Sequence, residues 1–239
     1  LGNDAFYANA SARRIYVYEE CVELYKSAWS DYKNSIYTNG QNYPDTTTIV
    51  YTTNDGNTIT SSKLPIISNI YDNGVGTMII GGIITEITGD AFSNCSNLTS
   101  ITIPDSVTTI GDAAFRNCSS LTSVTIGDSV TTIGEEAFYD CRSLTSVTIP
   151  DSVTTIGNYA FYCCGSLTSI TIPDGVTTIG NHAFNSCPSL TSVTIPDSVT
   201  TIGQGAFANC SSLTSVTIPD SVTTIGDWAF EYCSSLTSV

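Results

Sequence analysis

The chain has 239 residues, of which 41% are hydrophobic and only 12% are charged, and its formal net charge is −15. Residues 64–239 contain fifteen acidic residues but only two basic ones, Arg116 and Arg142. Such a surface repels nucleic acids and anionic membranes, whose binding needs lysine and arginine, and no apolar run approaches the roughly 20 residues that span a bilayer.

Residues 1–40 are expected to end an upstream array of repeats. The first segment, LGNDAFYANASARRIYV, is a degenerate copy of a 23-residue unit that recurs later, with Asn9 in the place of a cysteine. From Glu19 to Ala28 apolar residues are spaced among charged ones, which is typical of a short amphipathic helix. We interpret residues 1–40 as the last repeat and helical C-terminal cap of that array. Because the chain starts and stops within a repeat, we expect it to be a piece of a longer protein.

Residues 41–74 are predicted to be a linker and an N-terminal cap. The stretch TNGQNYPD at 38–45 has the composition of a linker. Residues 46–60 read TTTIVYTTNDGNTIT, in which β-branched runs flank Asp55 and Gly56. This pattern favours a β-hairpin, which we expect to cap the array that follows.

Residues 75–239 repeat with a period of 23 residues, and 75–97 form a degenerate first turn. A period of this length indicates a solenoid, in which each turn buries its apolar side chains against its neighbours. Two residue types mark the period in every turn. They are Phe92, Phe115, Phe138, Phe161, Phe184, Phe207 and Phe230, and Cys95, Cys118, Cys141, Cys164, Cys187, Cys210 and Cys233.

One unit, residues 98–120, reads LTSITIPDSVTTIGDAAFRNCSS. Its beginning matches the L-x-x-L-x-L strand pattern of leucine-rich repeats, with Ser100 and Thr102 facing outward. A Pro-Asp turn and a second short strand at 107–110 follow, and the segment around Ala114 and Phe115 is expected to be a short helical turn. The predicted fold class is a β-rich α/β solenoid with short strands and short helical turns.

The AFxxCxSLTSVTIPDSVTTIG units, together with the segment IYVYEECVELYKSAWSDYKNSIYT at 15–38, resemble the BspA-like leucine-rich repeats of bacterial and protist surface proteins. The resemblance extends over residues 1–38 and 75–239. It implies an extracellular or cell-surface location, adhesion, and binding to host or matrix proteins. It supplies no catalytic residues.

The cysteines are expected to be buried free thiols that donate to backbone carbonyls. Disulfides between neighbouring turns are compatible with the spacing of about 4.7–4.9 Å, but parallel side chains disfavour them. Calcium at the column of aspartates in the Pro-Asp turns is an alternative to a plain turn-forming role, which we prefer. The vicinal pair Cys163 and Cys164 points apart, so we expect no zinc site, no cofactor and no metal.

We expect no enzymatic activity, because His182, the one histidine, has no serine or cysteine tied to it by a catalytic pattern. Specific binding would have to use the residues that vary between turns, which flank each Ala-Phe pair. Large aromatic side chains contribute most to protein interfaces, although some could simply cover the edge of the core. The candidate partner-binding residues are Tyr139, Tyr159, Tyr162, His182, Trp228 and Tyr232.

Three functions remain open. The first is a non-enzymatic surface or secreted module that binds a host or matrix protein. The second is a passive spacer that displays other domains. The third is a binder of a repetitive glycan through the Ser/Thr face of the strands, which lacks the aromatic residues that sugar sites usually contain.

Overall fold

The computed structural model describes residues 15–16, 36–37, 46–61 and 63–238. The chain divides into two compact units, Leu1–Pro44 and Asp45–Val239. In the first unit, β1 (Ile15–Tyr16) and β2 (Ile36–Tyr37) pair in parallel. The rest of the expected upstream repeat, its helical cap and the linker lie outside the described residues.

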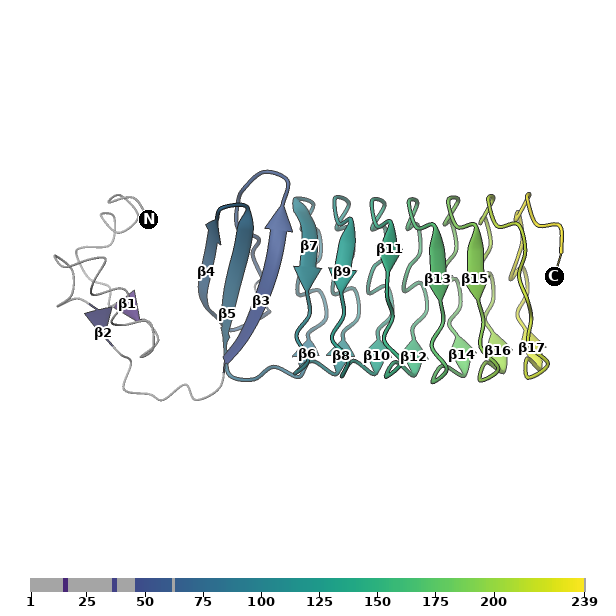
Figure 1. Ribbon diagram of the computed structural model, residues 1–239, viewed down its shortest axis with the longest axis horizontal. Coiled ribbons are helices and arrows are strands. Elements are labelled where there is room, and N and C mark those ends of the chain that lie inside the picture. Colours follow the sequence, from purple (N-terminus) through teal and green to yellow (C-terminus); the bar gives the residue numbers. More distant parts are fainter. Residues whose placement is uncertain (1–14, 17–35, 38–45, 62, 239) are drawn as a thin grey trace. The chain divides into compact units, whose positions relative to one another are not determined.

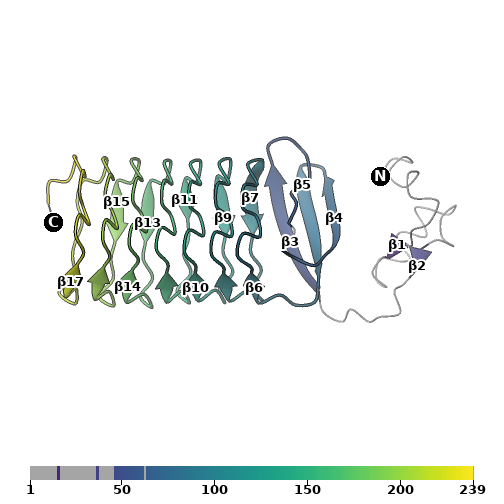
Figure 2. The ribbon, with the colours of Figure 1, turned by 180° about the vertical axis from the view of Figure 1, so that it is seen from behind.

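Residues 82–238 form a β-solenoid of about six turns, in which strands stack in two parallel columns (Figures 1 and 2). Paired residues are one repeat apart, as in Thr109↔Thr132. The first column contains β7 (Leu98–Thr102), β9 (Ser123–Thr125), β11 (Ser146–Val147), β13 (Ser169–Thr171) and β15 (Ser192–Thr194). The second contains β6 (Glu86–Ile87), β8 (Thr109–Ile110), β10 (Thr132–Ile133), β12 (Thr155–Ile156), β14 (Thr178–Ile179), β16 (Thr201–Ile202) and β17 (Thr224–Ile225).

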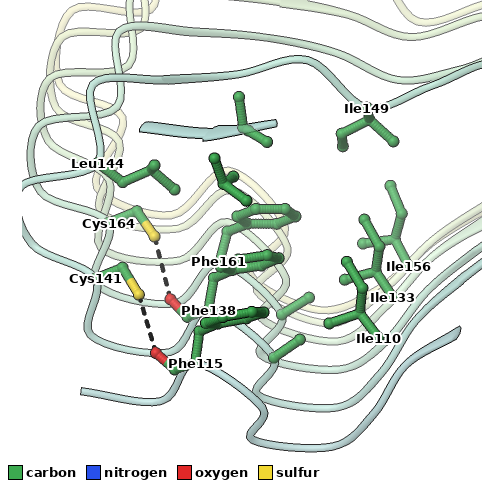
Figure 3. Close-up of a cluster of buried hydrophobic side chains, with 14 of the residues drawn as sticks. Ile110, Phe115, Ile133, Phe138, Cys141, Leu144, Ile149, Ile156, Phe161 and Cys164 are labelled. Atoms are coloured by element: carbon green, nitrogen blue, oxygen red, sulfur yellow. Dashed lines mark hydrogen bonds between the residues drawn. The ribbon is translucent and has the colours of Figure 1, made fainter. Parts of the chain in front are cut away.

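The core consists of columns of identical side chains that run from turn to turn (Figure 3). Phe115, Phe138 and Phe161 are fully buried, and their rings stack with centroids 5.2 Å apart. An isoleucine column, with Ile110, Ile133 and Ile156, faces them across the turn (Figure 3). The phenylalanine rings therefore pack against their own copies in the neighbouring turns, which is one reason why a single 23-residue unit cannot form a core alone.

The helical turns expected around Ala-Phe are wrong, and with them the α/β class: the described residues contain no helix. Every fourth residue of this segment has a left-handed backbone, with φ of 54° at Ala113 and 59° at Asn117, and this interrupts a right-handed helix. The amides of Ala113, Phe115 and Asn117 instead donate to carbonyls of the next turn, at 2.8 Å each. The intervening amides bond within their own turn, three residues back, so the segment forms linked β-turns.

The hairpin expected at 46–60 is also misplaced. β3 (Thr46–Thr53) is present, but residues 57–60 form no strand. The hairpin instead joins β4 (Ile66–Asp72) to β5 (Val75–Gly81) around Asn73 and Gly74, and β3 lies antiparallel between β5 and β7. Residues 75–81, expected in the first solenoid turn, therefore belong to three antiparallel cap strands, which continue the first column as one six-stranded sheet (Figure 1). β6 does pair in parallel with β8, as expected of a first turn.

Candidate functional site

The variable residues lie on the side of the solenoid where the linked β-turns of successive repeats stack. Because equivalent residues in neighbouring turns are only about 4.8 Å apart, large side chains in adjacent turns are forced into contact. The structure brings four of the six candidate residues together in this way. We call Tyr139, Tyr159, Tyr162 and His182 the aromatic cluster.

The rings of the aromatic cluster are connected by two stacked contacts and one tilted contact. Tyr139 and Tyr162 are parallel to within 9°, with centroids 4.9 Å apart. Tyr159 packs at a tilt against Tyr162, at 5.7 Å, and stacks on His182 at 5.0 Å. All four side chains are partly exposed. The cluster thus spans three turns and offers a connected aromatic surface to the solvent.

Each end of the cluster is closed by a different residue. At one end the Arg116 guanidinium lies over the Tyr139 ring, 5.0 Å from its centroid, which is a cation–π geometry. At the other end the His182 ring occupies the space above Gly205, where an added Cβ would come within 2.5 Å of its Nδ1. The buried Asn185 amide lies 3.1 Å from the same Nδ1 and also donates to the Gly205 carbonyl.

Both arginines of residues 64–239 lie beside this cluster, and both form ion pairs. Arg116 bonds Glu136 and Arg142 bonds Asp140, each at 2.7 Å. These pairs are partly exposed, so each contributes little to stability. Burial, followed by the neighbouring Tyr162, raises the pKa of Tyr139, so its phenol stays protonated and available as a hydrogen-bond donor. The cluster is therefore an aromatic surface with charged groups at its edge.

Two residues of the cluster have a backbone conformation that disfavours them. Tyr159 and His182 have φ values of 56° and 54°. A left-handed conformation costs an ordinary residue roughly 1–2 kcal/mol, which glycine avoids and asparagine reduces. The equivalent residue one turn later is Gly205, which shows that the fold accepts glycine here. The same conformation occurs at the equivalent positions of other turns, which are Asp90, Ala113, Glu136 and Trp228. It is therefore a property of every turn that the aromatic residues share.

The other two candidates, Trp228 and Tyr232, are not part of the cluster. They lie in the last turn and are 60% and 70% exposed, and no later turn packs against them in the structure. Sequence reasoning missed Arg116 and Asn185 as members of the site. A signal was present for Arg116, because it stands one repeat before Tyr139 and two before Tyr162.

The cysteine column is structural. The Sγ atoms of Cys141 and Cys164 donate to the carbonyls of Phe115 and Phe138, at 3.2 and 3.3 Å (Figure 3), and the same bond recurs from Cys118 to Cys233. Burial raises the pKa of Cys141 to about 12. The predicted thiol-to-carbonyl bond is thus confirmed. Among the described residues no group of three or more His, Cys, Asp or Glu side chains could hold a metal ion.

The Ser/Thr faces fall into two classes. Thr122, Thr145 and Thr168 donate their hydroxyl protons to the carbonyl of the equivalent threonine one turn earlier, and Thr131 and Thr154 do the same on the second column. These hydroxyls are part of the backbone network. The strand-face hydroxyls at 123–125, 146–148 and 169–171 are exposed, and no hydrogen bond to another described residue occupies them.

Comparison with known proteins identifies related sequences and structures. Six copies of the BspA type Leucine rich repeat region match residues 85–212 and 154–239. None of the curated proteins compared with the chain matches it significantly. Among the described residues there is also no helix long and apolar enough to cross a membrane.

Three solved structures resemble this chain. A leucine-rich repeat protein from Bacteroides ovatus is 36% identical with a TM-score of 0.64, over 75% of this chain and 45% of that protein. The T. pallidum leucine-rich repeat protein is 34% identical with a TM-score of 0.64, over 66% and 73%. A leucine-rich cell surface protein from Faecalibacterium prausnitzii is 37% identical with a TM-score of 0.60, over 79% and 54%. The chain therefore spans about half of the first and third of these proteins.

Proposed function

Because the chain belongs to the BspA-type leucine-rich repeat family, we propose that it is a non-enzymatic, extracellular or cell-surface binding module whose aromatic cluster contacts a host or matrix protein. The observation that carries the proposal is the unbroken series of ring contacts among Tyr139, Tyr162, Tyr159 and His182. It is partly exposed and spans three neighbouring turns. A surface location is supported by the similar cell surface protein of Faecalibacterium prausnitzii.

The physical basis is that a solenoid holds its exposed side chains rigid. The backbone under the cluster is hydrogen-bonded to the turns on both sides, as with Phe138 to Ala160 and Phe161 to Ala183, at 2.8 Å each. The rings are further fixed by stacking on each other. Tyrosines held in this way lose little conformational entropy on binding, which is why rigid aromatic side chains are effective interface anchors.

The test is a titration of the full chain against a panel of purified extracellular-matrix and plasma proteins. For any protein that binds, the double variant Tyr159→Ser, Tyr162→Ser is compared with the wild type, with circular dichroism as a check of the fold. Each anchor contributes roughly 2 kcal/mol, so affinity should fall at least about thirtyfold. Unchanged affinity in a folded double variant would refute the aromatic site.

Two other roles follow from different outcomes. A chain that binds nothing in such a panel would favour the passive spacer that displays other domains. Binding that survives the tyrosine changes but is lost in Thr148→Val, Thr171→Val would favour the glycan role, since those two hydroxyls lie on the exposed strand face.

A further inference from the structure

The charges around the aromatic cluster are not balanced. Arg116 and Arg142 are the only basic residues of 64–239, and each is already paired, with Glu136 and Asp140. Asp112 and Glu135 are exposed and have no ion-pair partner within the described residues. They lie in adjacent turns, since the Asp112 carboxylate accepts the Glu135 amide at 2.8 Å.

Glu135 lies in the turn that precedes Tyr159, and Asp112 lies one turn earlier. Glu136 is the equivalent of Tyr159 one turn earlier, so about 4.8 Å separates their backbones, and Glu135 precedes Glu136 directly. A cation that approaches Tyr159 therefore meets both an aromatic surface and an unpaired negative charge. Both attract guanidinium and ammonium groups, because an aromatic face carries negative charge density.

The molecule itself contains an example of this recognition. The Arg116 guanidinium lies over Tyr139, 5.0 Å from the ring centroid, while one of its nitrogens bonds Glu136 at 2.7 Å. One aromatic ring and one glutamate thus already hold an arginine at the end of the stack. Tyr139 covers the equivalent face of Tyr162, but Tyr159 presents a further ring in the same turn, and Glu135 in the preceding turn offers a carboxylate that forms no ion pair within the described residues.

We infer that the aromatic cluster, with Asp112 and Glu135, binds arginine or lysine side chains of a cationic segment in the partner protein. The inference rests on the proposed function, since it names the partner chemistry of the same site. The net charge of −15 supports it, because such a field would speed the encounter with a basic partner and repel an acidic one.

The experiment measures binding of a synthetic arginine-glycine peptide to the full chain, beside the same peptide with citrulline. Citrulline keeps the size and planarity of arginine without its charge. Trp228 and Tyr232 are accompanied by Asp227 and Glu231 in the last turn, so all variants are made in a Trp228→Ser, Tyr232→Ser background. We expect the citrulline peptide to bind about three- to thirtyfold more weakly, the range for a cation on an aromatic face, and the arginine peptide to bind more weakly as salt rises.

Two matched pairs of variants locate the site. Tyr159→Leu, Tyr162→Leu keeps apolar area but removes the rings, and should weaken arginine-peptide binding about tenfold. Thr148→Val, Thr171→Val on the strand face should leave it unchanged. Glu135→Gln should weaken binding more than Asp174→Asn, although each removes one exposed negative charge from the array.

Equal binding of the arginine and citrulline peptides would overturn the inference. It would also be overturned if the tyrosine and threonine double variants lost the same affinity for the arginine peptide, or if Glu135→Gln and Asp174→Asn did. If the arginine peptide does not bind but Tyr159→Ser, Tyr162→Ser still lowers affinity for a matrix protein, the proposed function stands and the cationic partner is wrong. If neither the peptide nor any matrix protein depends on the tyrosines, both proposals fail.

Discussion

The replacement Phe161→Ala tests whether stability in this solenoid is a sum over neighbouring turns. Phe161 is fully buried and stacks on Phe138 at 5.2 Å and on Phe184 at 5.3 Å. A buried Phe→Ala change costs about 3–5 kcal/mol, and contact on both faces places this site near the upper limit. Phe230 is only partly buried and stacks on Phe207 alone, at 5.4 Å, so Phe230→Ala should cost about half as much.

The assay is urea unfolding of the full chain, followed by far-ultraviolet circular dichroism. With a urea dependence of about 2–3 kcal/mol per molar for a domain of this size, a loss of about 4–5 kcal/mol lowers the midpoint by roughly 1.5–2 M. The Phe230 variant should shift it by no more than about 1 M, because only the last turn loses its packing. Equal shifts in the two variants would refute the nearest-neighbour account.

Three further predictions concern the backbone, the site and the thiols. Gly180→Ala should destabilise the chain by about 2–3 kcal/mol in the same assay, because its Cβ would lie 2.6 Å from backbone atoms of Gly157. At the exposed Gly56 there is room for a Cβ, and only the φ of 72° opposes a substitution. An unchanged midpoint for Gly180→Ala would show that the turns can separate. Tyr159→Asn should change the free energy of unfolding by less than about 1 kcal/mol, because relief of the left-handed strain offsets the lost stacking. The same change should still weaken partner binding. A large loss of stability would show that the Tyr159 ring is a structural element instead. Burial raises the pKa of Cys141 and Cys210 to about 12, above the unfolded value of about 8.5. The stability that these thiols provide is therefore complete below pH 8.5, and it falls by about 1.4 kcal/mol per pH unit per thiol as the pH rises toward 12. Equal urea midpoints at pH 8 and pH 10 would contradict their burial.

The sequence was sufficient to predict the solenoid, its period and its core. A 23-residue repeat whose apolar positions recur in each turn leaves few alternatives, and the shared inward direction of Ile101 and Ile103 follows from strand alternation. Even the bond from each cysteine to a carbonyl was predictable, because a buried thiol has few other partners. These features depend on local patterns or on exact repetition.

The errors came from interactions between segments that no local pattern reveals. The Ala-Phe segment has residues that a helical turn would accept, yet hydrogen bonds to the next turn hold Ala113 and Asn117 in left-handed conformations. The Asp55-Gly56 turn looked like a hairpin, but β3 pairs with β5 and β7 instead. The aromatic cluster could be predicted only in part. The tyrosines could be named from the sequence, but the contacts of Tyr159 with His182 and of Tyr139 with Arg116 depend on the geometry of adjacent turns.

The central claim is that binding occurs at the aromatic cluster and not at the hydroxyl face of the strands. The most direct measurement is hydrogen–deuterium exchange of the full chain, free and in complex with a protein that it binds. We predict that slowed exchange on binding is concentrated in residues 135–142, 158–163 and 181–186, which carry the cluster and its carboxylates. Slowed exchange concentrated instead in 123–125, 146–148 and 169–171 of the strand face would contradict the account.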